Sequence, residues 1–418
     1  GSNVLIQNNT VTRNRPGIET YYGSPVITRN RIAQNIDFST LYGSAIRVDI
    51  GPNLSGPAPT ITFNTIESNT AVGATIWFRY GGTQLHNNNI FNNTAPFELY
   101  LLNPSGSSQD PSGGTIDATN NFWAENDQRA IEQKVFDFLD TFGIQHGRVT
   151  PNPFLTSLVS QAPSPTTSVP APTVLAPELS GTIRGILTSD LTLRAADTPH
   201  TLADNLLVSP GVTLRLEPGV VLKAERDKFI RVDGALIADG TTSAPIRFTS
   251  NAATPAAGDW GGLMFTDSST DAQFDTSGRY VSGSVLRNVT FEYGGGIFIR
   301  DSFPLIEAST FRFSTSPSRF TDQNIQSYRL GVLTGWYLSS SDPSKTLSIL
   351  NSRFEDNTQG AIAIGVEAAL IKRGLILIQG NSISRNNGGG IFLNRSGLEG
   401  RVEANTIDNN GGPGVRVQ

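Results

Sequence analysis

The sequence contains no cysteine, three histidines and a single methionine among its 418 residues. Without cysteine, the chain forms no disulfide bonds and no thiolate metal sites. Histidine occurs only at His86, His146 and His200, which gives no histidine cluster that would bind zinc. The sequence also lacks an EF-hand loop and an Asp-rich calcium repeat. We therefore expect neither a metal site nor a cofactor.

Charge and long apolar runs are also scarce. Charged residues make up 16% of the chain, below the ~25% that is usual for soluble domains. The formal net charge is −5 and no basic stripe is present, which argues against a nucleic-acid partner. No apolar run approaches ~18 residues, so we expect no membrane span.

The sequence does contain a repeat, in which two asparagines frame a β-branched or aromatic residue and a glycine then opens an alternating apolar strand. The repeat begins with Asn9-Thr-Val-Thr-Arg-Asn14 and Gly17-Ile18, and it recurs at residues 30–48, 64–78, 351–364, 381–393 and 405–417. Rungs of ~20–25 residues that carry several short strands are typical of a parallel β-helix. We therefore predict an all-β solenoid of the right-handed parallel β-helix class.

The repeated asparagines have a structural interpretation. Like positions of successive rungs lie ~4.8 Å apart in such a solenoid, so the same side chain stacks on itself. Asparagine tolerates left-handed turn conformations, bonds to nearby backbone and forms amide ladders when it is stacked. This role accounts for each asparagine better than a catalytic role does.

Residues 126–143 interrupt the repeat. Four apolar side chains recur there at helical spacing, which predicts an amphipathic helix at about 127–142: Ile131, Val135, Leu139 and Phe142. Asn126 is its expected N-cap and Gly143 its expected end. An open end of a solenoid exposes strand edges and apolar core, so we interpret this helix as a cap.

The predicted cap is followed by a segment rich in Pro, Ser and Thr, at residues 160–178. This composition favours an extended spacer, so it predicts a linker. The expected domains are therefore 1–159, β-helix rungs closed by the capping helix, and 179–418, a second β-helix. Residues 3–14 match residues 375–386 almost position by position. We expect from this match that the chain is an excerpt of a longer array, truncated at its C-terminal end, whose flanking repeats are its partners.

The rungs resemble the right-handed parallel β-helix superfamily, which includes pectate lyases, polygalacturonases, alginate epimerases and bacterial surface proteins. The motifs that carry this resemblance are the Asn-x-Ile-x-x-Asn rungs, Asn120-Asn-Phe-Trp123, Val212-Thr-Leu-Arg-Leu-Glu-Pro-Gly219 and Asp259-Trp-Gly-Gly262. The latter two look like the opening segment of bacterial cell-surface, adhesin-like β-helix proteins. The resemblance implies a secreted or cell-surface bacterial location. The active-site motifs of the polygalacturonases and epimerases are absent.

One face of the first rod is a candidate binding surface, because alternate strand residues should point outward after each glycine. One outward row contains Glu19, Arg47 and Trp77, and a parallel row contains Tyr21, Asp49 and Arg79; Glu98 and Tyr100 extend them. Rings beside charged groups suit a polysaccharide or cell-surface glycan. Glu19 and Asp49 are weak catalytic candidates, since glycosidases use a carboxylate pair. The simpler alternative is a solvated sheet with ion pairs between rungs.

Two functions remain open from the sequence. The first is a non-catalytic extracellular stalk or adhesin segment of a larger protein. The second is a carbohydrate-binding or polysaccharide-cleaving module, lyase-like or glycosidase-like, that uses the outward face of the first rod.

Overall fold

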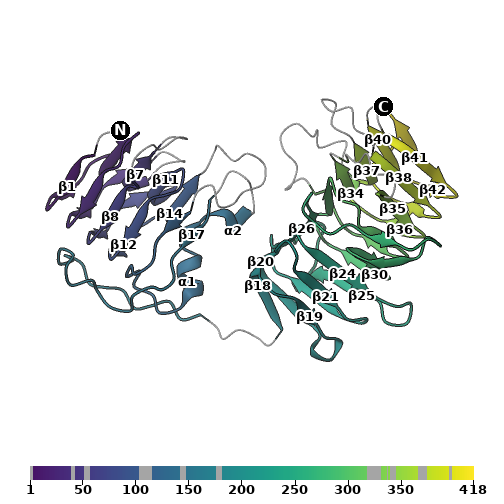
Figure 1. Cartoon of the computed structure of the whole chain (residues 1–418), viewed down its shortest axis with the longest axis horizontal. Coiled ribbons are helices and arrows are strands. Elements are labelled where there is room, and N and C mark those ends of the chain that lie inside the picture. The colour runs from purple at the N-terminus through teal and green to yellow at the C-terminus, as the bar shows by residue number, and fades with distance from the viewer. Residues whose placement is uncertain are drawn as a thin grey trace. The chain divides into compact units, whose positions relative to one another are not determined.

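The computed structural model describes residues 3–38, 43–50, 57–102, 115–141, 147–175, 181–317, 331–336, 338, 345–365, 374–394 and 398–418. The chain divides into two compact units, Gly1–Pro177 and Glu178–Gln418. Each unit is a stack of short parallel strands (Figure 1). The predicted all-β parallel β-helix fold is confirmed in both units.

Among its described residues, the first unit has three parallel sheets of four or more strands, and each is named here by its first strand. The β1 sheet contains β1 (Leu5–Gln7), β4 (Val26–Thr28), β8 (Thr60–Thr62), β12 (Gln84–His86), β15 (Ile116–Asp117) and β17 (Val149–Thr150). The β2 sheet contains β2 (Thr10–Thr12), β5 (Arg31–Ala33), β9 (Thr65–Glu67) and β13 (Asn89–Phe91). The β3 sheet contains β3 (Ile18–Tyr21), β7 (Gly43–Asp49), β11 (Ala74–Arg79), β14 (Phe97–Leu102) and β16 (Val135–Phe136). A short pair, β6 (Ile36–Asp37) and β10 (Thr70–Ala71), lies between sheets in sequence.

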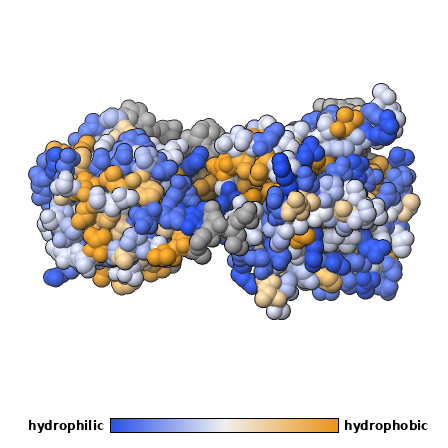
Figure 2. Space-filling model, turned by 90° about the horizontal axis from the view of Figure 1, so that it is seen from below, coloured by the Kyte–Doolittle hydropathy of each residue, from blue (hydrophilic) through white to orange (hydrophobic). Residues whose placement is uncertain are grey.

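The second unit is built around two larger parallel sheets. The β20 sheet runs in the order β42 (Thr406–Asp408), β39 (Ser382–Ser384), β36 (Arg353–Glu355), β33 (Thr310–Arg312), β30 (Val289–Glu292), β25 (Ile246–Ser250), β22 (Val221–Ala224), β20 (His200–Val208), β23 (Phe229–Val232), β26 (Gly262–Phe265), β31 (Ile297–Arg300), β34 (Gly331–Trp336), β37 (Gly360–Gly365), β40 (Ile391–Asn394) and β43 (Val415–Val417), with β18 (Thr182–Leu187) beside β20. The β19 sheet contains β19 (Leu191–Leu193), β21 (Thr213–Leu216), β24 (Ala235–Asp239), β29 (Val285–Arg287), β32 (Leu305–Glu307), β35 (Thr346–Leu350), β38 (Gly374–Gln379) and β41 (Leu398–Glu403). A 3-10 turn, η2 (Ala195–Asp197), and an antiparallel pair, β27 (Gln273–Phe274) and β28 (Tyr280–Ser282), lie outside these sheets. Hydrophilic residues cover much of the visible face of this unit (Figure 2).

Stacked apolar residues fill the interior of each rung. In the β3 sheet, Ile18, Ile46 and Ile76 are paired in register and belong to one buried cluster. The β1 and β2 sheets contribute Ile27 and Ile32 to the same cluster, both with 0% exposure. Each rung therefore buries its apolar face against the next rung, which is how solenoids acquire a continuous core.

Asparagine ladders are present in the first unit. Asn30 donates its backbone N–H (2.9 Å) and its side-chain amide (3.1 Å) to Asn64 Oδ1, and Asn64 donates in the same way to Asn88. One ladder joins Asn9, Asn30, Asn64, Asn88 and Asn121, and a second joins Asn14, Asn35, Asn69 and Asn93. The left-handed conformation lies one residue earlier than predicted: Phe63, for example, has φ 56° before Asn64.

The second unit uses mixed ladders in which serine replaces some asparagines. Ser309 N donates to Ser352 Oγ, Ser352 N donates to Asn381 Oδ1, and the ladder continues to Asn405. Serine is shorter, but its hydroxyl still accepts the backbone N–H of the preceding rung. The ladder pattern therefore tolerates either side chain.

The predicted capping helix at 127–142 is wrong as a continuous element. The structure has α1 (Gln128–Glu132), capped by the side chain of Asp127 rather than Asn126, then β16, then α2 (Phe138–Thr141). Val135 and Phe136 pair in register with Leu99 and Tyr100 as the last strand of the β3 sheet. Strand pairing at the open edge thus overrides the helical periodicity. The expected end at Gly143, like Phe142, lies outside the described residues.

Residues 160–175 were predicted as part of an extended linker, but in the structure they lie against the first unit. These residues belong to the first unit and hydrogen-bond to its β2 sheet. Within the described ranges, no helix is both long enough and apolar enough to cross a membrane.

Candidate functional site

The β3 sheet brings the predicted outward rows together. Glu19, Arg47, Trp77 and Tyr100 are aligned in register across β3, β7, β11 and β14. Tyr21, Asp49 and Arg79 form the neighbouring row two residues further along the same strands. Glu98 lies one position before the core residue Leu99 on β14, outside both rows.

Charged groups of the first row bond to one another. Arg47 Nη1 donates to Glu19 Oε1 at 2.7 Å, and the Tyr21 hydroxyl donates to the same oxygen at 2.8 Å. The Arg47 guanidinium also lies 5.2 Å from the ring centroids of Tyr21 and Trp77. Opposite charges on adjacent strands stabilise a sheet, and a carboxylate engaged in this way is a poor candidate for a nucleophile.

The second row is paired in the same manner. Arg79 Nη1 donates to Asp49 Oδ2 at 3.2 Å, and Asp49 is buried. The hydrogen bond from Arg79 to Asp49 raises the pKa of Arg79 above its usual value.

Burial removes two of the predicted residues from the exposed surface. Trp77 points away from the apolar core cluster, yet only 3% of it is exposed, so its ring is not an open platform for a sugar. Glu98 is 8% exposed and accepts a hydrogen bond from Asn93 at 3.0 Å, which ends the second asparagine ladder. Tyr100 stacks on Phe136 with ring centroids 4.7 Å apart. Tyr21, with 48% exposure, is the most open ring of the predicted face.

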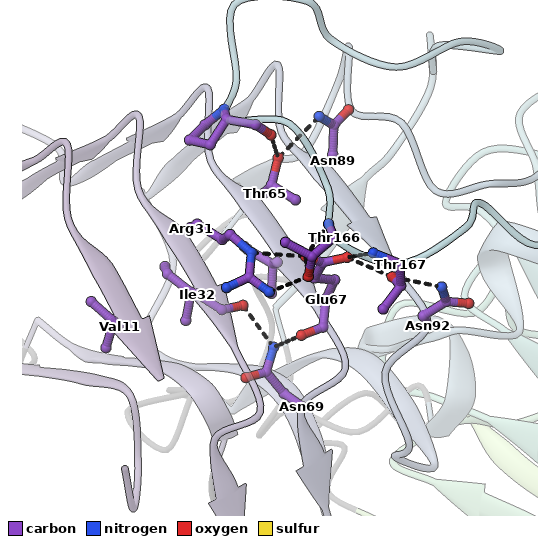
Figure 3. Close-up of polar contacts among 12 residues, drawn as sticks. Val11, Arg31, Ile32, Thr65, Glu67, Asn69, Asn89, Asn92, Thr166 and Thr167 are labelled. Atoms are coloured by element: carbon purple, nitrogen blue, oxygen red, sulfur yellow. Dashed lines mark hydrogen bonds and ion pairs between the residues drawn. The ribbon is translucent and has the colours of Figure 1, made fainter. Parts of the chain in front are cut away.

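A second polar cluster, on the β2 sheet, was not predicted. Glu67 on β9 has a side-chain exposure of 0%, and its carboxylate accepts bonds from Thr166 and Thr167 of the Pro/Ser/Thr-rich segment (Figure 3). Oε1 accepts from Thr166 N (2.9 Å) and Thr166 Oγ1 (3.0 Å), while Oε2 accepts from Thr167 N (3.1 Å) and Thr167 Oγ1 (2.5 Å). Arg31 on β5 donates to Glu67 Oε1 at 3.0 Å and also to the Thr166 hydroxyl.

Other side chains of the first unit hold the same segment. Asn92 donates its amide to Thr167 Oγ1 (3.0 Å) and to the Ser168 carbonyl (2.7 Å). Thr65 donates to the Pro163 carbonyl at 2.5 Å. Glu125, which is paired with Lys134 at 2.7 Å, accepts both the backbone N–H and the hydroxyl of Thr173. We call residues 163–173 the docked segment.

Ionisation of the two glutamates favours this arrangement. Burial opposes the charged form of Glu67, but the hydrogen bonds from Thr167 and Thr166 outweigh it and lower the pKa of Glu67 below its usual value. At Glu125, burial is likewise outweighed, here by Lys134 and Thr173, so the pKa of Glu125 is also lowered. Both carboxylates are therefore charged acceptors at neutral pH.

Among the residues that the structure describes, no group of three or more His, Asp or Glu side chains could hold a metal ion. The weak catalytic candidates Glu19 and Asp49 are held by different arginines on neighbouring strands.

Comparison with family models decides the classification. The model described as the right handed beta helix region matches residues 1–95 and 265–418, which is more than half of the chain. The chain belongs to the right-handed parallel β-helix family. A second model of this kind, the pectate-lyase like beta helix domain, matches residues 185–297. That match lies in the second unit, whereas the predicted carbohydrate face lies in the first.

Comparison with individual proteins gives one curated relative and two chains of one solved lyase. Protein bark beetle of Drosophila melanogaster is 33% identical over 131 residues, which is 31% of this chain and 4% of that protein. The chain therefore spans a very small part of that relative. Among solved structures, the PL6 family alginate lyase AlyGC is 11% identical with a TM-score of 0.25, covering 99% of this chain and 75% of that one. A mutant of the same lyase is 10% identical with a TM-score of 0.21, covering 96% of this chain and 85% of that one.

Proposed function

We propose that this chain is a non-catalytic β-helical rod segment of a larger extracellular protein, acting as a stalk or adhesin segment through length and stiffness. The observation that carries the proposal is the pairing of charged groups between rungs. Glu19 is neutralised by Arg47, and Asp49 by Arg79, on neighbouring strands of one sheet. A catalytic face would instead direct its carboxylates at a substrate.

The second unit supports the same function. Glu292, with a side-chain exposure of 0%, accepts from Arg247 (2.6 Å) and Arg312 (3.0 Å), and the three residues come from three consecutive strands of the β20 sheet. Buried charges that are bonded on both sides hold rungs in register, because removing one partner leaves a charge that is costly to bury. The ladders add a hydrogen-bonded column inside each rod.

The match to a much larger protein fits a segment role. The aligned 131 residues make up 4% of protein bark beetle, so in that relative the matched sequence is a small part of a long chain. We extend this to the present chain as a proposal, together with the expected location outside the cell and a bacterial source.

Mechanical unfolding of single molecules tests the stalk function. The full chain should resist force as two units, and Asn64→Ala should lower the unfolding force of one unit only, because Asn64 is the middle residue of a ladder in the first unit. An unchanged force distribution in Asn64→Ala would show that the ladders carry no load.

A carbohydrate-binding role of the β3 sheet is the second candidate. Tyr21 favours it, since its ring is 48% exposed and is backed by Arg47, which leaves an aromatic face beside a charged group. Rings stack on sugars, and polar groups at their edges bond to hydroxyls. Loss of polysaccharide binding in Tyr21→Ala, with binding by the wild type, is the result that this candidate requires.

A further inference from the structure

We propose that the outer face of the β2 sheet is a binding site for extended, threonine-containing peptides, and that the docked segment, residues 163–173, is its resident and displaceable occupant. The ligand class is an extended peptide with two adjacent threonines and a third threonine six positions after the second. This site is separate from the β3 sheet, on which the carbohydrate candidate rests.

The contacts are those of peptide recognition by side chains. Glu67 accepts hydrogen bonds from the backbone N–H and the hydroxyl of both Thr166 and Thr167. It therefore selects residues that offer two donors each. Asn92 supplies the opposite polarity, donating to the Thr167 hydroxyl and to the Ser168 carbonyl. Valine in place of threonine would keep the shape but lose the hydroxyl, which is what makes the site selective.

Glu67 is shielded from water with the docked segment in place. The carboxylate has an exposure of 0%, and Arg31 bonds to Oε1 only. Thr167 supplies both the N–H and the hydroxyl that Oε2 accepts. A carboxylate that a ligand shields from water needs donors from that ligand, because an uncompensated buried charge is costly. The face is therefore built around a ligand that brings N–H and O–H groups.

A second anchor fixes the spacing. Glu125 accepts the N–H (2.7 Å) and the hydroxyl (2.9 Å) of Thr173, in the same two-donor manner as Glu67. Pro170 and Pro172 lie between the anchors. Proline lacks a backbone N–H and favours an extended chain, so these positions hold the separation of the anchors without offering donors of their own.

The occupant is held by polar bonds rather than by burial. Thr166, Ser168, Pro170, Pro172 and Thr173 are all exposed, so the segment lies on the surface of the sheet. Little apolar area is removed from water at these positions, and the hydrophobic contribution scales with that area. A peptide that offers the same donors can consequently exchange with it.

Fluorescence anisotropy on the full chain tests the site. The probe is a labelled peptide of residues 160–175, and its control carries valine at the three threonines. The receptor is the full chain with Thr166→Val, Thr167→Val and Thr173→Val, which weakens the resident segment but leaves the β2 sheet intact. We expect this receptor to bind the probe at least about ten-fold more tightly than the wild-type chain, and the control peptide about ten-fold more weakly than the probe.

Two further variants in the receptor locate the binding. Glu67→Gln and Asn92→Asp should each weaken binding of the probe by about ten-fold. Asn8→Asp is the matched control, because Asn8 has the same left-handed backbone (φ 59° against 55° for Asn92) and is exposed. It should leave binding unchanged.

Limited proteolysis of the receptor makes each outcome decisive. Faster cleavage within residues 160–175 than in the wild type, together with probe binding that the control peptide lacks, supports the site. Faster cleavage without probe binding overturns it, because the face is then vacant and does not bind. Unchanged cleavage also overturns it, because the threonine hydroxyls then do not hold the segment. Equal binding of probe and control peptide overturns the threonine selectivity.

Discussion

Asn93 donates its side-chain amide to Glu98 Oε2 at 3.0 Å, and this bond ends the second asparagine ladder of the first unit. A carboxylate therefore accepts the amide where the stack would otherwise require another asparagine. Glu98 was predicted as part of a carbohydrate-binding face, but its burial assigns it to the internal structure of the rod.

Replacing Glu98 separates its charge from its role as an acceptor. Burial raises the pKa of Glu98, so the stability it contributes is present in acid and is lost as the pH rises through its folded-state pKa. Glu98→Gln keeps an acceptor for Asn93 without the buried charge, and we expect it to raise the urea midpoint of the first unit at pH 7. Glu98→Ala should lower that midpoint. Equal destabilisation by both variants would mean that the charge is needed.

The middle of the first ladder should carry more stability than its end. Asn64 has an exposure of 0%, accepts from Asn30 and donates to Asn88. Asn64→Ala should lower the free energy of unfolding by about 3 kcal/mol, because it leaves several buried groups without partners. Asn9→Ala, at the exposed end of the same ladder, should cost about 1 kcal/mol. Denaturant unfolding gives both values, and equal losses would contradict the ladder account.

Asp137 makes the end of the first unit sensitive to pH. Burial raises the pKa of Asp137 to about 6, although it accepts the N–H groups of Leu139 and Val149. A raised pKa means that stability increases as the pH falls through 6, by about 1 kcal/mol between pH 7.5 and pH 5. Urea unfolding at the two pH values measures this increase. In Asp137→Asn the increase should disappear; if it persists, another group causes it.

Acid should release the docked segment, whereas acid increases the stability that Asp137 contributes. The pKa values of Glu67 and Glu125 are lowered. The stabilisation that these carboxylates give the docked segment is therefore fully present above the usual glutamate pKa and is lost as the pH falls through the folded-state values. Hydrogen exchange of residues 163–173, corrected for intrinsic rates, should show protection at pH 7 that is lost well below pH ~4. In Glu67→Gln, the segment should show weak protection at both pH values. Protection that does not change with pH would exclude the carboxylates as its source.

Much of the fold follows from the sequence because the rung is short and local. The spacing of Asn9 and Asn14 and of their equivalents places both ladders, and strand alternation places Glu19, Arg47 and Trp77 in one row. Burial of Trp77 could not be derived in this way, because alternation gives the direction of a side chain but not what covers it. The helical spacing of Ile131 and Val135 predicted their burial correctly, but not that β16 would pair with β14.

The docked segment was missed because its composition is ambiguous. A Pro/Ser/Thr-rich stretch is typical of a free linker, and nothing in the local sequence of Glu67 marks it as an anchor for residues about 100 positions later. A polar segment docks only where acceptors at the right spacing face it. That spacing, set by Glu67 and Glu125 on different rungs, exists only in the folded chain.

Turnover of polysaccharides tests the central claim most directly. The full wild-type chain should be incubated with a panel of acidic and neutral polymers, including pectate and alginate, and the products measured by reducing ends and by the ultraviolet absorbance of unsaturated sugars. The rod account predicts no product above a heat-denatured control for every polymer. Product formation from any polymer would contradict it, and a reduction of that product in Arg47→Ala or Asp49→Asn would place the catalytic site on the β3 sheet.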